Sequence, residues 1–136
     1  VTPPLLNKHW YSDGKGFIDD LFKDLVGAIQ LEGIDTIAAS YLLGHTHGLE
    51  QQAHYDACDF TMIYYPKLDW QSDWGGGTLI GDTLVSYVGD RLVIFSCDQM
   101  HQGQPVSKYC QELRPIVVFQ CNAKNAMVER LSWQTT

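Results

Sequence analysis

The chain has 136 residues and a formal net charge of −7 at pH 7, with 45% hydrophobic and 18% charged residues. The acidic balance argues against a nucleic-acid partner, because phosphate binding requires a basic surface. No apolar run reaches the roughly 18 residues of a membrane-spanning helix. Length and composition fit a single domain over residues 1–136, with a helical part over about 1–33 and a core over about 34–133.

The N-terminal segment and the cysteines bear on the cellular compartment. Val-Thr-Pro-Pro has no charged and apolar signal pattern, so we expect a cytoplasmic location, and the missing initial methionine is consistent with a trimmed start. The four cysteines are Cys58, Cys97, Cys110 and Cys121, and they form no CxxC pair. We interpret them as buried or half-buried free thiols in a reducing compartment. A single disulfide is the alternative, because spacing alone does not exclude one.

Residues 17–29 predict an amphipathic helix. Apolar residues recur there at i, i+4 spacing, with acids and lysines on the other face. Ser12 or Asp13 can cap its start, and Gly33 can end it. We interpret this helix as a support for a sheet rather than as a binding element.

After Gly33 the pattern changes to short apolar runs separated by turn residues. Such runs predict strands, which we place at Ile34–Leu43, Phe60–Tyr65, Thr78–Ile80, Thr83–Val88, Arg91–Ser96, Pro115–Cys121 and Met127–Trp133. Many short strands behind one helix indicate a sandwich or barrel. The predicted fold class is therefore mainly β with a flanking helix.

His54, Asp56 and His101 are candidate metal ligands. Two imidazoles and one carboxylate suit a divalent first-row metal and leave positions open for substrate and O2. In an extended strand residues i and i+2 share a face, so His54 and Asp56 can converge while Tyr55 points away. His101 follows a later strand, whose end a barrel can bring close. An HxD tripeptide with a distant histidine also arises by chance, so the residues alone leave both interpretations open.

Arg114, beyond His101, is a candidate anion clamp. Its guanidinium can hold the carboxylate of an organic acid through two hydrogen bonds. Lys108 lies between the two residues and is the alternative clamp. Pro115 restricts Arg114 to extended geometry and removes one strand hydrogen bond.

Gly44-His45-Thr46-His47, with Glu50 close behind, forms a second histidine pair that partly resembles the cupin metal motif. In cupins the glutamate stands further from the HxH, and Pro-x-Gly precedes the later histidine. Here Gln102-Gly103-Gln104-Pro105 follows His101 instead. We therefore interpret His45 and His47 as residues of a polar loop.

Longer motifs resemble the Fe(II)- and 2-oxoglutarate-dependent oxygenases, in particular their prolyl 4-hydroxylase-like branch. His54–Trp70 contains an HxD, the strand Thr-Met-Ile-Tyr-Tyr, which corresponds to the T-x-I-x-Y part of T-x-I-x-Y-L, and an Asp-Trp turn. Trp74–Leu79 matches G-G-x-L, and Asp90–Phe95 matches a Gly-Arg-Leu-Val-x-Phe strand that precedes a histidine and a basic residue. The resemblance covers roughly residues 41–121. It implies a double-stranded β-helix (jelly-roll) core.

The resemblance also implies a role for each matching residue. His54, Asp56 and His101 would bind iron, and Arg114 would pair with the distal carboxylate of 2-oxoglutarate. Tyr65 could donate a hydrogen bond to the same carboxylate, and Tyr41 is a candidate for the pocket wall. Further expectations concern apolar packing by Leu79 and Phe95, an opposite orientation for Tyr64, and a groove-lining or loop-bracing role for Trp70 and Trp74.

The implied activity is a dioxygenase reaction that uses Fe(II), 2-oxoglutarate and O2, with ascorbate as a candidate auxiliary reductant. It would hydroxylate a substrate C–H bond and release succinate and CO2. The branch favours a prolyl residue in a peptide or protein, while a small metabolite or free amino acid is the alternative. A jelly roll that binds a ligand without iron is a non-catalytic alternative. We expect no nucleic-acid or membrane partner, and the oligomeric state stays open.

The chain departs from the branch in three respects. Tyr65-Pro66-Lys67 replaces Tyr-Leu-Asn, which should affect the loop more than the site. Ile116 stands where many members have serine two residues after the arginine. The chain is also short for the branch, which is consistent with a minimal member or a trimmed domain.

Overall fold

The computed structural model describes residues 10–12, 16–29, 34–49, 51–123 and 133–135. The helices in these ranges are α2 (Gly16–Ala28) and the short 3-10 helix η1 (Ser72–Trp74). The strands are β1 (Trp10–Ser12), β2 (Ile34–His45), β3 (Phe60–Tyr65), β4 (Thr78–Ile80), β5 (Thr83–Val85), β6 (Arg91–Ser96), β7 (His101–Gly103), β8 (Arg114–Ala123) and β9 (Trp133–Thr135). Within these ranges, no helix is long and apolar enough to cross a membrane.

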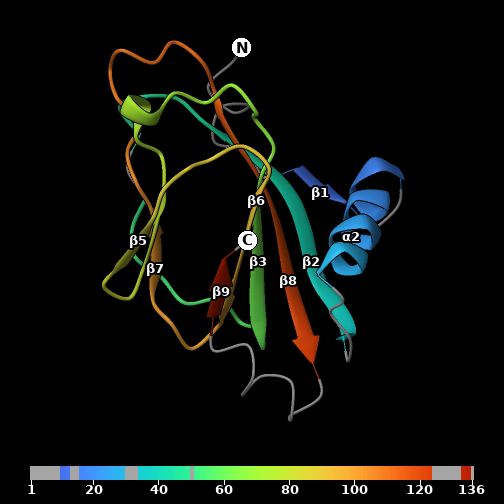
Figure 1. Cartoon of the computed structure of the whole chain (residues 1–136). Coiled ribbons are helices and arrows are strands. Elements are labelled where there is room, and N and C mark those ends of the chain that lie inside the picture. The colour runs from blue at the N-terminus through green and yellow to red at the C-terminus, as the bar shows by residue number, and fades with distance from the viewer. Residues whose placement is uncertain (1–9, 13–15, 30–33, 50, 124–132, 136) are drawn as a thin grey trace.

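The strands form two antiparallel sheets that face each other (Figure 1). The larger sheet has the order β1-β2-β8-β3-β6-β9, and the smaller has the order β5-β4-β7. The late strand β8 lies between β2 and β3, so these two strands, which follow each other in the chain, are not neighbours in the sheet. This arrangement is a jelly roll with one flanking helix, and it confirms the predicted fold class.

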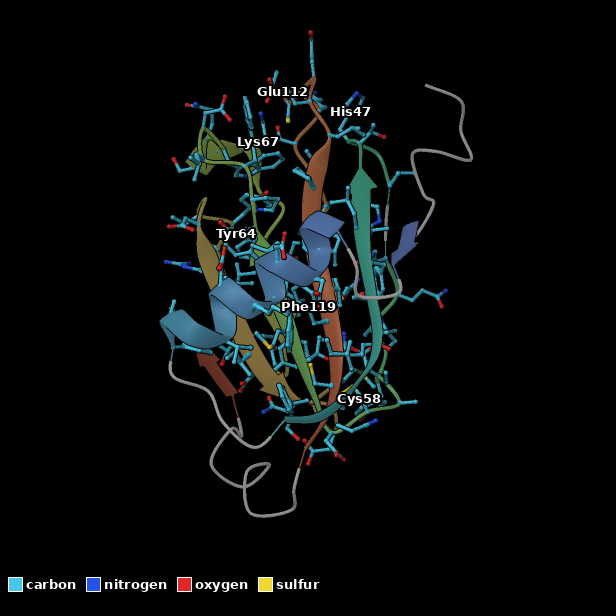
Figure 2. The ribbon with its side chains drawn as sticks, turned by 90° about the vertical axis from the view of Figure 1, so that its right-hand side faces the viewer. His47, Cys58, Tyr64, Lys67, Glu112 and Phe119 are labelled. Carbon is cyan, nitrogen blue, oxygen red and sulfur yellow. A yellow bond between two sulfur atoms is a disulfide. The ribbon has the colours of Figure 1, made fainter. Side chains whose placement is uncertain are left out.

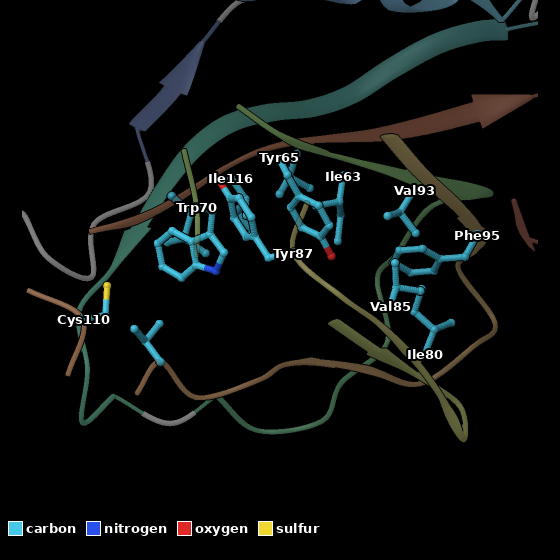
Figure 3. Close-up of a cluster of buried hydrophobic side chains, with 13 residues drawn as sticks. Ile63, Tyr65, Trp70, Ile80, Val85, Tyr87, Val93, Phe95, Cys110 and Ile116 are labelled. Carbon is cyan, nitrogen blue, oxygen red and sulfur yellow. The ribbon is translucent and has the colours of Figure 1, made fainter. Parts of the chain in front are cut away.

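The space between the two sheets holds one hydrophobic core (Figure 3). Ile63 and Val93 enter it from the larger sheet, and Ile80 and Val85 enter it from the smaller sheet. Each of these side chains is at most 5% exposed. Burial of side chains of this size contributes about 1.5–3 kcal/mol each, which holds the two sheets together.

Helix α2 covers the outer face of the larger sheet. Ile18 and Phe22 are buried there, and the Phe22 ring meets Phe119 of β8 edge-on at 5.0 Å between centroids. Figure 2 shows α2 lying across the sheet with Phe119 beneath it. Alternation along β3 turns Met62 toward the helix and Ile63 toward the inner core. The predicted supporting role of the helix is therefore confirmed.

The strand predictions differ in accuracy. β3, β4 and β6 have the predicted bounds, whereas β5 ends at Val85 rather than Val88, because its three-residue partner β4 pairs only that far. β1 and β7 were not predicted; the sequence of β7, His-Gln-Gly, contains no apolar run. The predicted run Met127–Trp133 lies outside the described residues except for Trp133 in β9.

The cysteines divide into one disulfide and two free thiols. Cys58 and Cys97 are bonded, with their Cα atoms 5.7 Å apart, and Cys110 and Cys121 are buried and free. The interpretation of all four as free thiols is therefore wrong for the first pair. The cause is strand register: Phe60 pairs with Ser96, so Cys58 and Cys97 lie just beyond the paired ends of neighbouring strands. A reducing compartment was inferred from four free thiols, and the Cys58–Cys97 disulfide removes two of them from that argument.

Candidate functional site

The HxD segment and the start of β7 lie side by side. His54 and His101 form an antiparallel bridge with two backbone hydrogen bonds of 2.9 and 3.0 Å. Asp56 follows in a loop, so the extended strand expected through residues 54–56 is not formed. The three side chains nevertheless converge, because the bridge places the two histidines opposite each other and the loop brings the carboxylate back between them.

The ring nitrogens and the carboxylate form a compact group of donors. His54 Nε2 is 3.6 Å from Asp56 Oδ1, and His101 Nε2 is 3.3 Å from Asp56 Oδ2. One ligand atom from each residue lies within 4.8 Å of the others. Each ring directs Nδ1 at a carbonyl, that of Gln52 at 2.9 Å for His54 and that of Gln99 at 3.3 Å for His101. Such bonds orient the ring and leave Nε2 for a metal.

Asp56 also accepts a hydrogen bond from a hydroxyl group. Thr61 Oγ1 donates a 2.6 Å hydrogen bond to Asp56 Oδ2, and the aspartate side chain is 6% exposed. Burial raises the pKa of Asp56, but hydrogen bonds from His101 and Thr61, with the favourable electrostatics of both histidines, bring the pKa below its usual value. The carboxylate is therefore ionised near neutral pH, as a metal ligand must be.

A cavity of about 70 Å³ begins at this group and runs inward between the sheets. His54, Asp56 and His101 line it together with Arg114 of β8. Its other walls come from Tyr41, Leu43, Gln51, Thr61, Ile63, Thr78, Gly103, Ile116 and Val118. The His54 side chain is 46% exposed and that of His101 only 6%, so the cavity opens to solvent on the His54 side.

Arg114 is the one large cation buried in this cavity wall among the described residues. Its Nε donates to the carbonyl of Gly76, and its Nη2 lies 3.3 Å from the carbonyl of Gly77 and 3.5 Å from Thr78 Oγ1. No described group accepts a hydrogen bond from Nη1. Burial lowers the pKa of Arg114, an effect that Tyr65 and Tyr87 oppose. An unpaired donor on a buried cation is costly, so the site is suited to an anion.

The structure separates the two tyrosines named from the sequence. Tyr41 lines the cavity. Tyr65 lies behind its wall, where its hydroxyl is 2.7 Å from Thr78 Oγ1 and its ring stacks on Tyr87 (Figure 3). Tyr64 points to the opposite face, as strand alternation predicts, and donates to Asp90. Tyr65 therefore contacts the Arg114 region through Thr78.

The other candidates occupy different positions. Lys108 is exposed, with Nζ 5.3 Å from the centroid of the Tyr109 ring, and it does not line the cavity. The Phe95 ring lies 4.6 Å from that of His101, whereas Leu79 is half-buried in β4. Trp70 is buried and donates to the Gly75 carbonyl, so it braces this loop. Lys67 forms ion pairs with Asp69 and Glu112. The replacement of Tyr-Leu-Asn by Tyr65-Pro66-Lys67 therefore brings new contacts between loops.

Among the described residues, the cupin-like histidine pair belongs to no candidate metal group. His45 ends β2 opposite Arg114 and is buried, with Nε2 3.3 Å from Gln51 Nε2, so the polar-loop interpretation is wrong for this residue. His47 is exposed in the following turn, at the end of the sheet opposite Cys58 (Figure 2). Glu50 lies outside the described residues. In the described part of the chain, candidate metal groups are confined to His54–Asp56–His101 and to Asp56 with the two disulfide-bonded cysteines.

Sequence reasoning missed several residues of the site, notably Thr61, Thr78, Gln51 and Gly103. Gln51 Oε1 accepts a 2.9 Å hydrogen bond from Gly103 N, and a Cβ on Gly103 would collide with that amide. Thr61 and Thr78 lie within the T-x-I-x-Y and G-G-x-L motifs, and these motifs could have identified them as site residues. Gln51 carried no signal, because its contacts join positions far apart in the chain.

Gly76 supports Arg114 and should not tolerate a side chain. Its φ is +77°, and an added Cβ would lie 3.0 Å from the Trp70 ring and 3.1 Å from Arg114 Cδ. We expect Gly76→Ala to lower the free energy of unfolding by about 1–3 kcal/mol in urea titrations. Gly27→Ala is the matched control: this helical glycine has open space around it, so alanine should stabilise by about 0.5–1 kcal/mol. Equal effects at both positions would contradict this packing.

Comparison with known proteins gives matches among solved structures alone. No family model matches the sequence, and no curated protein is significantly similar. A prolyl-4-hydroxylase from Pseudomonas putida superposes with a TM-score of 0.67 at 16% identity, over 86% of this chain and 72% of that one. A Trichoplax adhaerens prolyl hydroxylase, in complex with a peptide fragment of the hypoxia inducible factor oxygen degradation domain, gives 0.62 at 17%, over 98% and 70%.

A prolyl 4-hydroxylase from Phytophthora capsici gives a TM-score of 0.54 at 16% identity, over 76% of this chain. The match spans 39% of that longer chain. At these identities the similarity concerns the arrangement of the strands. The two facing sheets with their flanking helix are therefore the jelly-roll fold of the prolyl 4-hydroxylases.

Proposed function

We propose that this protein is an Fe(II)- and 2-oxoglutarate-dependent dioxygenase that hydroxylates a substrate C–H bond, with a prolyl residue of a peptide or protein as the favoured target. One observation carries the proposal. Buried Arg114, whose Nη1 has no described hydrogen-bond partner, lines the same cavity as His54, Asp56 and His101. A dicarboxylic acid that binds a metal at one end requires a cation at the other.

The donor set fits Fe(II). His54, His101 and Asp56 offer two nitrogens and one carboxylate oxygen, which hold the metal and leave positions for 2-oxoglutarate and O2. Bound iron and 2-oxoglutarate supply the oxidising chemistry that hydroxylates the substrate and releases succinate and CO2. The carbonyls of Gln52 and Gln99 keep both rings oriented by accepting from Nδ1.

Arg114 would bind the distal carboxylate of 2-oxoglutarate. Nη1 is free to donate, and Nη2 is held beside the Thr78 hydroxyl, which can turn toward the same anion. Tyr65, proposed from the sequence as a direct donor, would act here by orienting that hydroxyl. Leu43, Ile116 and Val118 give the cavity an apolar lining that limits water. Tyr41 contributes to the wall, and exposed Lys108 has no part in the clamp.

The substrate assignment is supported by the neighbours and by the exposed side of the site. The three similar structures are prolyl hydroxylases, and one of them holds a peptide. The half-exposed His54 side leaves room for a segment of polypeptide to approach. The same chemistry on a small metabolite or free amino acid is the second candidate. A cupin-like or iron-free binding protein is disfavoured, because it would not explain why Arg114 and the triad line the same cavity.

Anaerobic addition of Fe(II) and 2-oxoglutarate tests this proposal. The pair together should produce the weak visible metal-to-ligand charge-transfer band, and neither should do so alone. Succinate release, measured with ascorbate present, should then rise with proline-containing peptides above a panel of small acids and amino acids. Absence of the band would overturn the oxygenase assignment, whereas a band with equal background for every peptide would overturn only the prolyl substrate.

A further inference from the structure

The metal-ligand loop is tied to the larger sheet next to Asp56. Cys58 is two residues beyond Asp56, and its disulfide partner Cys97 directly follows β6 and is 3% exposed. Thr61 lies between the disulfide and the carboxylate. Its Oγ1 donates to Asp56 Oδ2 at 2.6 Å and lies 3.3 Å from Cys97 Sγ and 3.5 Å from Cys58 Sγ. One hydroxyl thus contacts both the proposed iron ligand and the covalent link.

We propose that Thr61 and the Cys58–Cys97 disulfide position the Asp56 carboxylate, so that metal affinity depends on the oxidation state of this disulfide. The inference rests on the metal site of the proposed function. Thr61 is fully buried in β3 and cannot follow the loop if it moves. The carboxylate therefore keeps its orientation only while the loop stays against the sheet.

The loop has few other restraints on the side of Asp56. Residues 57–59 form a bend, and the sheet holds its far end through Asp59, which donates to Cys121 O and accepts from Cys97 N, both at 3.0 Å. His54 is held by its bridge to His101 on the near side. Between these two points the disulfide is the covalent restraint. Its loss should loosen Asp56 without unfolding the sheet, because both hydrogen-bonded ends persist.

The chemical change is a two-electron reduction. With a water-soluble phosphine, the S–S bond breaks, each sulfur gains one electron and one proton, and phosphorus gives up the two electrons and takes the oxygen of water. A dithiol makes the same change by exchange and becomes a disulfide itself. Cys58 is half-buried, so a small reductant can reach the bond. Reoxidation restores the original state.

Mn(II) is the probe, followed by the loss of the free-ion electron paramagnetic resonance signal. It prefers oxygen and nitrogen ligands, whereas softer metals could bind the freed cysteines beside Asp56, whose ligand atoms lie within 4.8 Å of one another. We expect reduction followed by removal of the phosphine, or the double change Cys58→Ser and Cys97→Ser, to raise the Kd for Mn(II) at least about tenfold. Reoxidation of the reduced protein should reverse the effect.

Thr61 gives a second and independent measurement. Thr61→Val keeps the shape but removes the hydroxyl, and should raise the Kd about 10- to 100-fold. Thr61→Ser retains the hydroxyl and should restore binding to near the native value. This rescue separates positioning from packing, because both variants alter a buried side chain. Circular dichroism melts establish that each variant is folded at the temperature of the titration.

Two controls accompany these titrations: a count of free thiols in each redox state, and phosphine treatment of the double serine variant. The oxidised, denatured protein should show two thiols, those of Cys110 and Cys121, and the reduced protein should show all four. Phosphine treatment of the double serine variant should change nothing. Equal Kd values for oxidised and reduced protein, or weak binding by Thr61→Ser, would overturn the inference and leave the metal site intact. Failure of the oxidised native protein to bind Mn(II) would overturn both proposals.

Discussion

His101→Ala is expected to remove metal binding and 2-oxoglutarate turnover together. His101 is 6% exposed, its Nε2 lies 3.3 Å from Asp56 Oδ2, and its ring packs against Phe95. Alanine would leave two ligands where three are needed. The loss of affinity should exceed the roughly 100-fold upper range for outer-sphere changes. The measurements are the Kd for Mn(II) and the charge-transfer band with Fe(II) and 2-oxoglutarate, which should vanish.

His54→Ala and His47→Ala provide the comparison. His54 is half-exposed and bears little of the packing, so its loss should remove the band without lowering the melting temperature. His47 is exposed in a turn and should behave like the native protein in every measurement. Survival of the band in either the His54 or the His101 variant would mean that iron is held elsewhere.

Arg114→Ala should weaken 2-oxoglutarate binding about 100-fold or more, a change of about 2.7 kcal/mol, with metal affinity within about threefold. Hydrogen bonds to a charged group contribute about 1.5–3 kcal/mol each, and the unpaired Nη1 with Nη2 offers two to a carboxylate. Because Arg114 also binds the carbonyls of Gly76 and Gly77, alanine can disturb the loop. Arg114→Lys keeps the charge but loses the two-pronged geometry, and is the second variant.

Lys108→Ala is the matched control for charge. Its side chain is exposed beside Tyr109, so 2-oxoglutarate affinity should be unchanged. Isothermal titration with Mn(II)-loaded protein gives the Kd for 2-oxoglutarate in each case. If Lys108→Ala weakens 2-oxoglutarate binding while both Arg114 variants leave it unaltered, the clamp has been assigned to the wrong residue.

Local periodicity was sufficient for most of the secondary structure. Helix α2 was predicted because Phe22 and its neighbours repeat with the period of a helix, and β3 and β6 because their runs are long enough to be recognised. β7 could not be found in the same way. Its His-Gln-Gly is a strand only because β4 pairs with it, and pairing is not a property of three residues.

The candidate site was predicted in its residue types but not in its geometry. His54, Asp56 and His101 were named from their chemistry and from the motif, and His54 and Asp56 converge while Tyr55 is exposed, but residues 55 and 56 do not belong to a strand. A loop and one bridge bring them together instead. Tyr65 was named as a possible donor to the anion, yet its hydroxyl lies 2.7 Å from Thr78 Oγ1, and Thr78, from the facing sheet, is the residue beside Arg114 Nη2.

The sequence by itself determined the fold class and the supporting helix, and it named the candidate triad with Arg114 or Lys108 as the clamp, since these depend on local period, residue chemistry and motif order. Only the tertiary structure decided that Arg114 rather than Lys108 lines the cavity, that Nη1 lacks a partner, and that Cys58 meets Cys97 beside Thr61. These features depend on the register between strands that are distant in the chain. Register is set by the packing of the whole core, which no local stretch of residues contains.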